Sequence, residues 1–242
     1  MRLDLFLSEN GYADSRTSAK NLICSGSVTV NGKKITKPSF EVPCDAEISV
    51  DKSANPFASR GGLKLLAALD EFKINTDGVL ALDIGASSGG FTDCLLHRGA
   101  KSVIAVDSGS GQIADFLRRD TRVCVIENYN ARYMTAGDLI YRPDFVVMDV
   151  SFISATYIIP AISEVILPGG EFVCLVKPQF EVGKSGIGKG GIVKSPVMRE
   201  SALNKVVSFA ESFGFLCVGT MQSPIIGGDG NIEYLAYFRK ER

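Results

Sequence analysis

A glycine-rich turn near residue 85 is the segment of this chain best suited to bind a small molecule. The apolar run Val79–Ile84 contains one acidic residue, Asp83, and a turn with Gly85, Gly89 and Gly90 follows it directly. A buried strand, a tight loop and the start of a helix, in this order, hold the sugar and the polar tail of a nucleoside cofactor.

The spacing of the glycines distinguishes between cofactors. A dinucleotide-binding fold requires Gly-x-Gly-x-x-Gly, whereas this turn reads Gly-x-x-x-Gly-Gly. An ATP-binding P-loop requires a lysine after its last glycine, and Phe91-Thr92 supplies none. An acidic residue two positions before the first glycine, with no cation nearby, suits a cofactor that has an amino group and no phosphate. We therefore expect S-adenosylmethionine (SAM).

A second acidic residue, Asp107, ends the next apolar run, 24 residues after Asp83. Its carboxylate can accept hydrogen bonds from two ribose hydroxyls, although an aspartate that caps a helix would occupy the same position. After the third run, either Asn128 or Asn130 can meet the adenine edge. The residues expected around the cofactor are Asp83, Gly85, Ser87, Gly89, Gly90, Phe91, Asp107, Asn130 and Asp149.

Four charged residues stand next to apolar segments in which charge is unexpected. Lys64 lies in an apolar helical pattern, Asp149 and Lys177 end apolar runs, and Glu233 begins the last run. At one edge of a parallel sheet all four can converge on the methyl group of the cofactor. Lys177, flanked by Asp149 and Glu233, can orient a hydroxyl acceptor and stabilise the oxyanion that forms from it. Action as a general base requires the neutral amine, and both roles stay open.

The elements that must position these residues alternate between helices and fully apolar strands, which predicts a doubly wound, Rossmann-like α/β domain with seven strands. The last two strands have no helix between them and should pair as a hairpin at the sheet edge. The expected strands are Val79–Ile84, Ser102–Val106, Val123–Glu127, Asp144–Asp149, Phe172–Val176, Phe215–Thr220 and Glu233–Phe238. The expected helices are Leu63–Leu69, Phe91–Arg98, Ile113–Arg119, Ala155–Leu167 and Val197–Phe213.

The first 52 residues form a separate small α+β pattern. A short amphipathic helix ends near Gly11, a second helix has Ser15 as its N-cap and stops at Gly26, and Asn31-Gly32 predicts a hairpin turn. Seven basic and seven acidic residues occur here, so charge alone fits an RNA-binding surface and an ordinary solvated surface equally well. The basic residues expected to contact RNA are Arg2, Arg16, Lys20, Lys33 and Lys34.

Several motifs together resemble known families. The order of helices and hairpin before residue 52 resembles the S4 RNA-binding domain, and the set of Lys64, Asp149, Lys177 and Glu233 resembles the catalytic tetrad of FtsJ-like ribose 2′-O-methyltransferases. The motifs are Ser59-Arg60-Gly61-Gly62-Leu63-Lys64, Met148-Asp149-Val150-Ser151-Phe152-Ile153-Ser154, Val176-Lys177-Pro178-Gln179-Phe180-Glu181 and Gly230-Asn231-Ile232-Glu233-Tyr234. The whole chain resembles the TlyA family, also labelled haemolysins.

This resemblance implies an S4 domain over residues 1–54, a linker over 55–62 and a SAM-dependent methyltransferase domain over 63–242. It implies 2′-O-methylation of cytidines in ribosomal RNA, with ribosomal RNA or ribosomal subunits as partners. The label haemolysin raises the alternative of a membrane-active protein, and a third possibility is an RNA-binding protein that keeps the fold without catalysis. Base methylation would call for an Asn/Asp-Pro-Pro-aromatic motif, and Asp149-Val150-Ser151-Phe152 lacks the proline pair.

A second glycine-rich segment, Gly183–Gly190, matches most of the P-loop pattern but has Gly190 where serine or threonine should hold magnesium. We expect it to be a basic lid on RNA rather than an ATP site. Arg60, Lys184 and Lys189 complete the residues expected to contact RNA.

The composition narrows the remaining classes of function. The net charge of −1 does not by itself indicate a nucleic-acid-binding protein. The chain has a single histidine and six cysteines with no Cys-x-x-Cys pair, so no metal site is expected. Most of the cysteines lie in apolar strands or helices and should be core side chains in a reducing cytosol. No run approaches the ~18 apolar residues of a membrane span. We expect a cytoplasmic protein.

Overall fold

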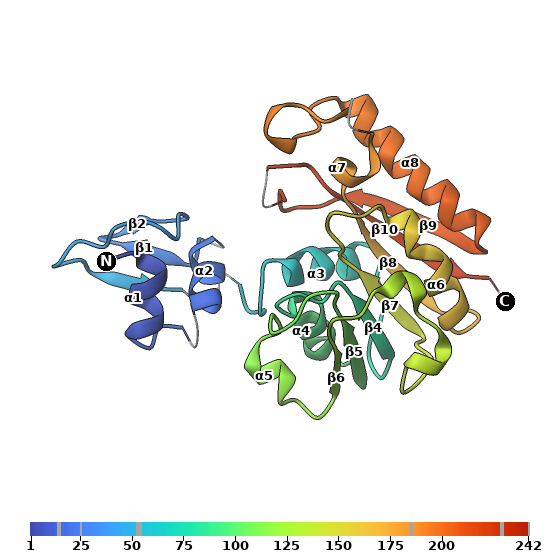
Figure 1. Ribbon diagram of the computed structural model, residues 1–242, viewed down its shortest axis with the longest axis horizontal. Helices are drawn as coiled ribbons and strands as arrows, with labels where there is room; N and C mark the ends of the chain where they lie inside the picture. Colours follow the sequence, from blue (N-terminus) through green and yellow to red (C-terminus); the bar gives the residue numbers. More distant parts are fainter. Residues whose placement is uncertain (14–15, 25, 52–54, 184–185, 228–229, 242) are drawn as a thin grey trace. The chain divides into compact units, whose positions relative to one another are not determined.

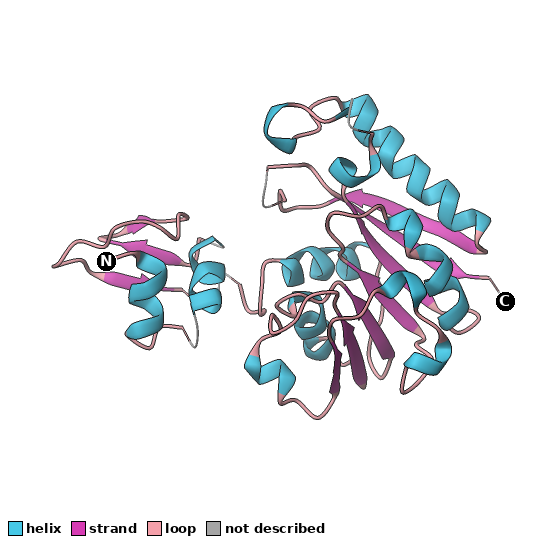
Figure 2. Cartoon of the chain, in the orientation of Figure 1, coloured by secondary structure: helices cyan, strands magenta, loops and turns pink. Residues whose placement is uncertain are grey.

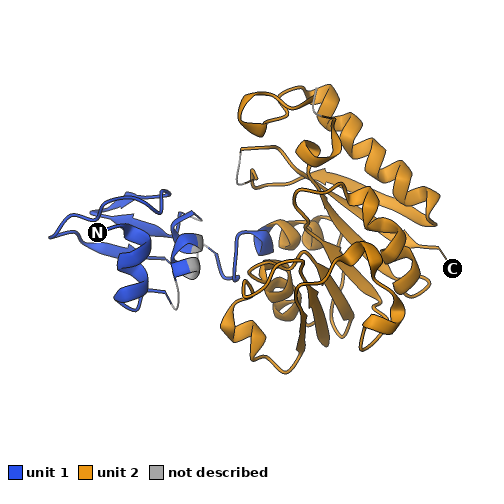
Figure 3. Cartoon of the chain, in the orientation of Figure 1, with its two compact units in different colours: residues 1–63 blue, residues 64–242 orange. Residues whose placement is uncertain are grey.

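The chain folds into two compact units, Met1–Leu63 and Lys64–Arg242, which are coloured separately in Figure 3. The structure is a computed structural model that describes residues 1–13, 16–24, 26–51, 55–183, 186–227 and 230–241. The N-cap expected at Ser15 lies outside these residues.

The first unit packs two helices on a three-stranded antiparallel sheet of order β2-β1-β3. Its elements are α1 (Leu3–Glu9), α2 (Arg16–Cys24), β1 (Val28–Val30), β2 (Lys33–Lys34) and β3 (Ile48–Val50). The hairpin predicted at Asn31-Gly32 is confirmed: both residues have positive φ, 51° and 73°, as a type I′ turn requires. Strand β3 was not predicted, because three residues are too few to establish an alternating pattern.

The second unit is a seven-stranded sheet of order β6-β5-β4-β7-β8-β10-β9 (Figures 1 and 2). Its strands are β4 (Leu80–Ile84), β5 (Ser102–Val106), β6 (Val123–Ile126), β7 (Phe145–Met148), β8 (Glu171–Val176), β9 (Phe215–Gln222) and β10 (Tyr234–Lys240). Strands β4 to β8 are parallel, and β10 is antiparallel to both β8 and β9. The predicted strands and the terminal hairpin are therefore confirmed.

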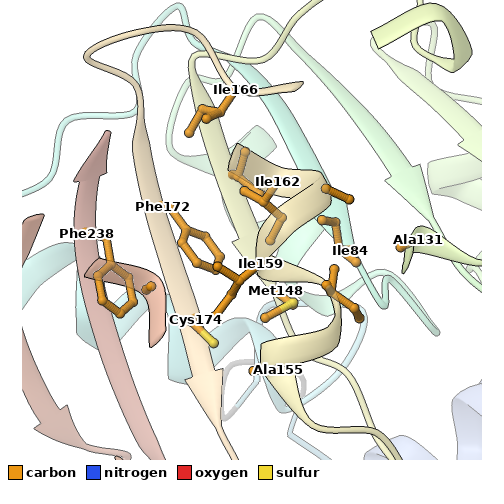
Figure 4. Packing of buried hydrophobic residues seen from close by; sticks show 14 of the residues in the cluster. Ile84, Ala131, Met148, Ala155, Ile159, Ile162, Ile166, Phe172, Cys174 and Phe238 are labelled. Carbon is orange, nitrogen blue, oxygen red and sulfur yellow. The ribbon is translucent and has the colours of Figure 1, made fainter. Parts of the chain in front are cut away.

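Helices cover both faces of this sheet (Figure 1). They are α3 (Gly61–Glu71), α4 (Gly90–His97), α5 (Asp115–Arg118), α6 (Ile159–Val165), α7 (Pro178–Glu181) and α8 (Pro196–Ser212). Helices α6 and α8 share one buried cluster with the even-numbered side chains of β4, β7, β8 and β10. Figure 4 shows Ile159 and Ile162 of α6 against Met148, Phe172 and Cys174 of the sheet. The opposite face is covered from the side of α3, where the Phe72 ring that follows this helix stacks on Tyr237 at 5.5 Å.

Three expectations about local structure were wrong. The helix expected over 155–167 is broken into a 3-10 turn, Ala155–Tyr157, and α6, because Pro160 lacks a backbone donor and suits only the first turn of a new helix. Helix α5 has four residues instead of the seven expected. Most of the cysteines were expected in the core, but Cys94 and Cys174 are buried, Cys24, Cys124 and Cys217 are half-buried, and Cys44 is exposed.

Candidate active site

The strand register places the candidate catalytic residues on one face of the sheet. Side chains alternate between faces along a strand, so the odd-numbered residues of β4, β7, β8 and β10 point away from the cluster of α6 and α8. Asp149, Lys177 and Glu233 directly flank β7, β8 and β10, and all three continue the odd-numbered series. They therefore lie on the side of α3, the helix that carries Lys64.

The four residues form two separate ion pairs. Nζ of Lys177 lies 2.6 Å from Oδ1 of Asp149 and donates a hydrogen bond to Oγ of Ser151 at 2.8 Å. Nζ of Lys64 lies 2.6 Å from Oε2 of Glu233, whose side chain is only 3% exposed. We expected Lys177 to be flanked by both carboxylates. Instead Glu233 pairs with Lys64, because α3 brings a second cation to the start of β10.

A cavity of about 480 Å³ opens at the carboxyl ends of β4, β5 and β7. Of the residues expected around a cofactor, five line it: Gly85, Ser87, Asp107, Asn130 and Asp149. Ligands in open parallel sheets bind at this end of the strands. Asp149 belongs to both the cavity wall and the ion pair with Lys177, so the two parts of the site meet at this residue.

The turn after β4 packs closely against neighbouring segments of the chain. Gly85 has φ of +82°, and a Cβ there would lie 2.4 Å from the carbonyl oxygen of Asp149, so a side chain at this position would displace the cavity wall. Gly89, Gly90 and Phe91 lie at the start of α4 and are not part of the cavity wall. A Cβ on Gly89 would lie 2.2 Å from Leu117, so this glycine is required for packing beneath the turn.

Asp83 is completely buried below the turn and has unused hydrogen-bonding capacity. Its Oδ2 accepts a hydrogen bond from Oγ1 of Thr92 at 2.7 Å, whereas Oδ1 has no hydrogen-bond partner in the described part of the chain. Burial raises the pKa of this carboxyl to about 7, and the nearby charges of Asp149 and Asp107 act in the same direction, against the Thr92 hydrogen bond. A positively charged ligand group nearby would offset this cost.

Asp107 holds the loops that frame the cavity. Its Oδ2 accepts from the backbone N–H of Ser87 at 2.8 Å, and its Oδ1 accepts from that of Gly109 at 2.7 Å. Each carboxylate oxygen can accept a further hydrogen bond, so this role leaves capacity for ligand hydroxyls. Of the two candidate asparagines, Asn130 lines the cavity beside Tyr129 and Arg132, and Asn128 does not.

Phe152 is a candidate residue that the sequence did not reveal. Phe152 lines the cavity and is 91% exposed to solvent. Its φ of +64° is a strained backbone conformation for a residue with a bulky side chain. Its ring contacts that of Phe180 at 5.3 Å between centroids. Exposed aromatic rings beside a polar site are platforms on which nucleic-acid bases stack. Its place after Asp149 was the available signal, but backbone strain is not visible in a sequence.

The residues expected to contact RNA differ in their surroundings. Arg2 and Arg16 both donate to the fully buried Asp4, each at 2.9 Å through Nε, and their side chains stay 40% and 47% exposed. This arrangement orients the two guanidinium groups, and Arg2 in particular holds the pKa of the Asp4 carboxyl well below its usual range. Lys20, Lys33, Lys34 and Lys189 are exposed, Arg60 is half-buried, and Lys184 lies outside the described residues.

The strand order, with antiparallel β10 between β8 and β9, and the cavity at the carboxyl ends of β4 and β5 define the class: an α/β domain with the fold of SAM-dependent methyltransferases. The chain belongs to the FtsJ-like methyltransferase family, whose model matches residues 57–240, and it carries an S4 domain over residues 1–48.

Similar proteins match almost the whole chain. The "Putative rRNA methyltransferase YqxC" of Bacillus subtilis is 44% identical over 98% of this chain and 84% of its own length. The "16S/23S rRNA (cytidine-2'-O)-methyltransferase TlyA" of Mycobacterium tuberculosis is 42% identical over 99% of this chain and 90% of its own. A solved structure titled "Putative hemolysin from Streptococcus thermophilus" has a TM-score of 0.81 and 41% identity, covering 100% of this chain and 88% of that one.

Within residues 1–13, 16–24, 26–51, 55–183, 186–227 and 230–241, no helix has the length and apolar character needed to cross a membrane. The same residues contain no group of three or more histidine, cysteine, aspartate or glutamate side chains arranged to hold a metal ion.

Proposed function

We propose that this methyltransferase uses SAM to methylate the 2′-hydroxyl of a ribose in ribosomal RNA, and that the acceptor is a cytidine. The observation that carries the proposal is the double role of Asp149, which lines the cavity and pairs with Lys177 at 2.6 Å. The cavity proposed to hold the cofactor would thereby lie next to a lysine suited to a hydroxyl acceptor. The names of the relatives from Bacillus and Mycobacterium support ribosomal RNA as substrate, which would place the enzyme in the cytoplasm.

The cavity residues suit SAM, which supplies a methyl group activated by a sulfonium. We propose that Asp107 accepts hydrogen bonds from the ribose hydroxyls and that Asn130 meets the adenine edge. Asp83, with its free Oδ1, would balance positive charge on the cofactor from below the turn. Gly85 and Ser87 of the cavity wall would lie against the methionine part, and Gly89, Gly90 and Phe91 would shape the turn at the start of α4.

The four charged residues would act on the acceptor. The Lys177 ammonium, which contacts Asp149 and Ser151, would orient the ribose hydroxyl and stabilise negative charge as its proton leaves to solvent. An ammonium in an ion pair suits this role better than that of a general base. Lys64 and Glu233 would fix the floor of the site, since their pair is almost completely buried. Correct positioning of oxygen and methyl group supplies much of the acceleration in reactions of this type.

The first unit would bind the RNA substrate. We propose that residues 1–54 act as the RNA-binding domain and residues 55–62 as the linker, with Arg2, Arg16, Lys20, Lys33 and Lys34 against the phosphate backbone. The pairing of Arg2 and Arg16 with Asp4 supports this by fixing two partly exposed guanidinium groups. Arg60, Lys184 and Lys189 would add further contacts with the RNA.

Transfer of tritium from [methyl-³H]SAM to purified ribosomal subunits tests the proposal. The wild-type protein should label one subunit or both, and Lys177→Ala should abolish labelling. Lys101→Ala is a matched control, because Lys101 is exposed at the opposite end of the sheet and should leave the rate unchanged. A 2′-O-methyl group protects the adjacent phosphodiester from alkali, so the label should be recovered in alkali-resistant dinucleotides. Label in mononucleotides would show base methylation, and no incorporation into any subunit would refute the proposal.

A further inference from the structure

Glu181 makes a second connection between the segment that carries Asp149 and the segment that carries Lys177. At one end of these segments, Lys177 contacts Asp149 and Ser151 as described above. At the other end, Oε2 of Glu181 accepts a hydrogen bond from Oγ of Ser154 at 2.5 Å, and Oε1 accepts one from the backbone N–H of Ala155 at 2.7 Å. The segments 149–155 and 177–181 are therefore connected at both ends.

The chemistry of this second connection is unusual for a purely structural contact. The Glu181 side chain is 2% exposed, and the cation that pairs with it in the described part of the chain is Lys205 of α8, at 3.3 Å. Lys205 also donates to the backbone carbonyl of Glu181 at 3.1 Å. Burial of a carboxylate is costly, and well-packed apolar residues often stabilise a fold as much as a buried ion pair does. A role in fixing geometry accounts for the charge better than stability does.

The backbone between the two connections needs such a restraint. Phe152 lies between Ser151 and Ser154 with a φ of +64°, a conformation that persists in a bulky residue only when its surroundings hold it. The Phe152 ring rests on Phe180, the residue before Glu181. Phe152 and Phe180 therefore both lie between the contacts that Lys177 makes at one end and the contacts that Glu181 makes at the other.

We propose that Glu181 is a positioning residue for methyl transfer: by binding Ser154 and Ala155, it holds the 149–155 segment so that Asp149 and Ser151 stay against Lys177. The catalytic part of this inference rests on the function proposed above, whereas its geometric part does not. Lys205 extends the same connection to α8, which follows the basic glycine-rich segment.

The geometric part is tested by NMR of the full-length protein labelled with [ε-¹³C]lysine, with the Lys177 signal assigned from Lys177→Arg. Glu181→Ala and Ser154→Ala should each shift the Lys177 signal, because its contacts with Asp149 and Ser151 would loosen. Glu164→Ala is the matched control, since Glu164 is exposed on α6, and it should leave the signal in place. An unchanged Lys177 signal in both Glu181→Ala and Ser154→Ala would overturn the proposal.

The catalytic part is tested by single-turnover methyl transfer well below the melting temperature of each variant. Glu181→Ala should lower the rate by about 10- to 100-fold with RNA affinity unchanged, as small misplacements of reacting groups do. Glu181→Gln keeps one acceptor oxygen for Ala155 and should recover part of the rate. A wild-type rate per folded molecule in Glu181→Ala would overturn this role; should that variant fail to fold, Ser154→Ala gives the same decision. If the wild-type protein methylates no ribosomal RNA, the proposed function fails and the NMR result still decides the geometry.

Discussion

Replacement of Asp83 by asparagine should change how the stability of the second unit depends on pH. Asp83 is buried between β4 and α4, and its Oδ2 accepts from Thr92. Asparagine has nearly the same shape, keeps an oxygen for the Thr92 hydroxyl and does not titrate. The variant therefore removes the ionisation of this group while preserving its packing, and the difference between the two proteins isolates the free energy of that ionisation.

The magnitude follows from the pKa. Burial raises the pKa of Asp83 from its ordinary value of 3.8 to about 7, so the folded protein binds this proton more tightly than the unfolded chain does. Its contribution to stability is then complete below pH 3.8 and is lost as the pH rises through about 7. The whole loss amounts to about 4 kcal/mol, of which about 3 kcal/mol falls between pH 5 and 8.

Urea unfolding between pH 5 and 8, followed by far-ultraviolet circular dichroism, measures this difference. The unfolding free energy of the wild-type second unit should fall relative to that of Asp83→Asn by about 3 kcal/mol over this range. Asp115→Asn, which removes an exposed carboxyl from the same unit, should give a curve parallel to the wild type. Parallel curves for wild type and Asp83→Asn would refute the reasoning.

Cofactor binding provides a second way to measure the ionisation of Asp83. If SAM places positive charge near Asp83, binding at pH 7 should release about half a proton, because the carboxyl is then about half protonated in the free protein. Calorimetry in two buffers of different ionisation enthalpy counts this proton, and Asp83→Asn should release none. Equal release by both proteins would show that Asp83 does not respond to the cofactor.

Three other predictions address the rest of the site. Lys64→Met should destabilise the protein by about 3–5 kcal/mol, because Glu233 is left buried without its partner. The double variant with Glu233→Met should recover much of that stability but no methyl transfer. Urea unfolding measures the stability, and the tritium assay measures the methyl transfer. Phe152→Ala should lower single-turnover transfer about 10-fold and Phe152→Tyr should restore it, if the ring stacks on a base; equal rates would exclude stacking. The ion pairs of Arg2 and Arg16 with Asp4 lower the pKa of the Asp4 carboxyl. Their contribution to the stability of the first unit is therefore complete above the ordinary pKa of an aspartate and is lost as the pH falls below it. The temperature of thermal unfolding should consequently depend less on pH between 3 and 7 in Asp4→Asn than in the wild type.

Much of the fold was predictable because its signals are local. The apolar runs of the second unit matched its seven strands within one or two residues. The central strands are buried on both faces and must be continuously apolar, whereas the edge strand β9 alternates between exposed and less exposed residues. Asn31-Gly32 predicted its hairpin because few residue pairs accept two positive φ angles in succession. The helix break at Pro160 and the three-residue strand β3 were not predicted, because the sequence signals for them extend over only a few residues.

The sequence by itself determined which residue types stand at or next to the ends of the strands. Apolar runs, and the glycines that follow the first of them, mark these ends, and Asp83, Asp107, Asp149 and Lys177 lie there. The tertiary structure alone decided how they pair. Lys177 binds Asp149 and Ser151, and Lys64 binds Glu233, because the folded sheet brings together segments that are far apart in the sequence. Likewise, the strain at Phe152 and the contact of Glu181 with Ser154 depend on distances between segments far apart in the chain, which no local pattern encodes.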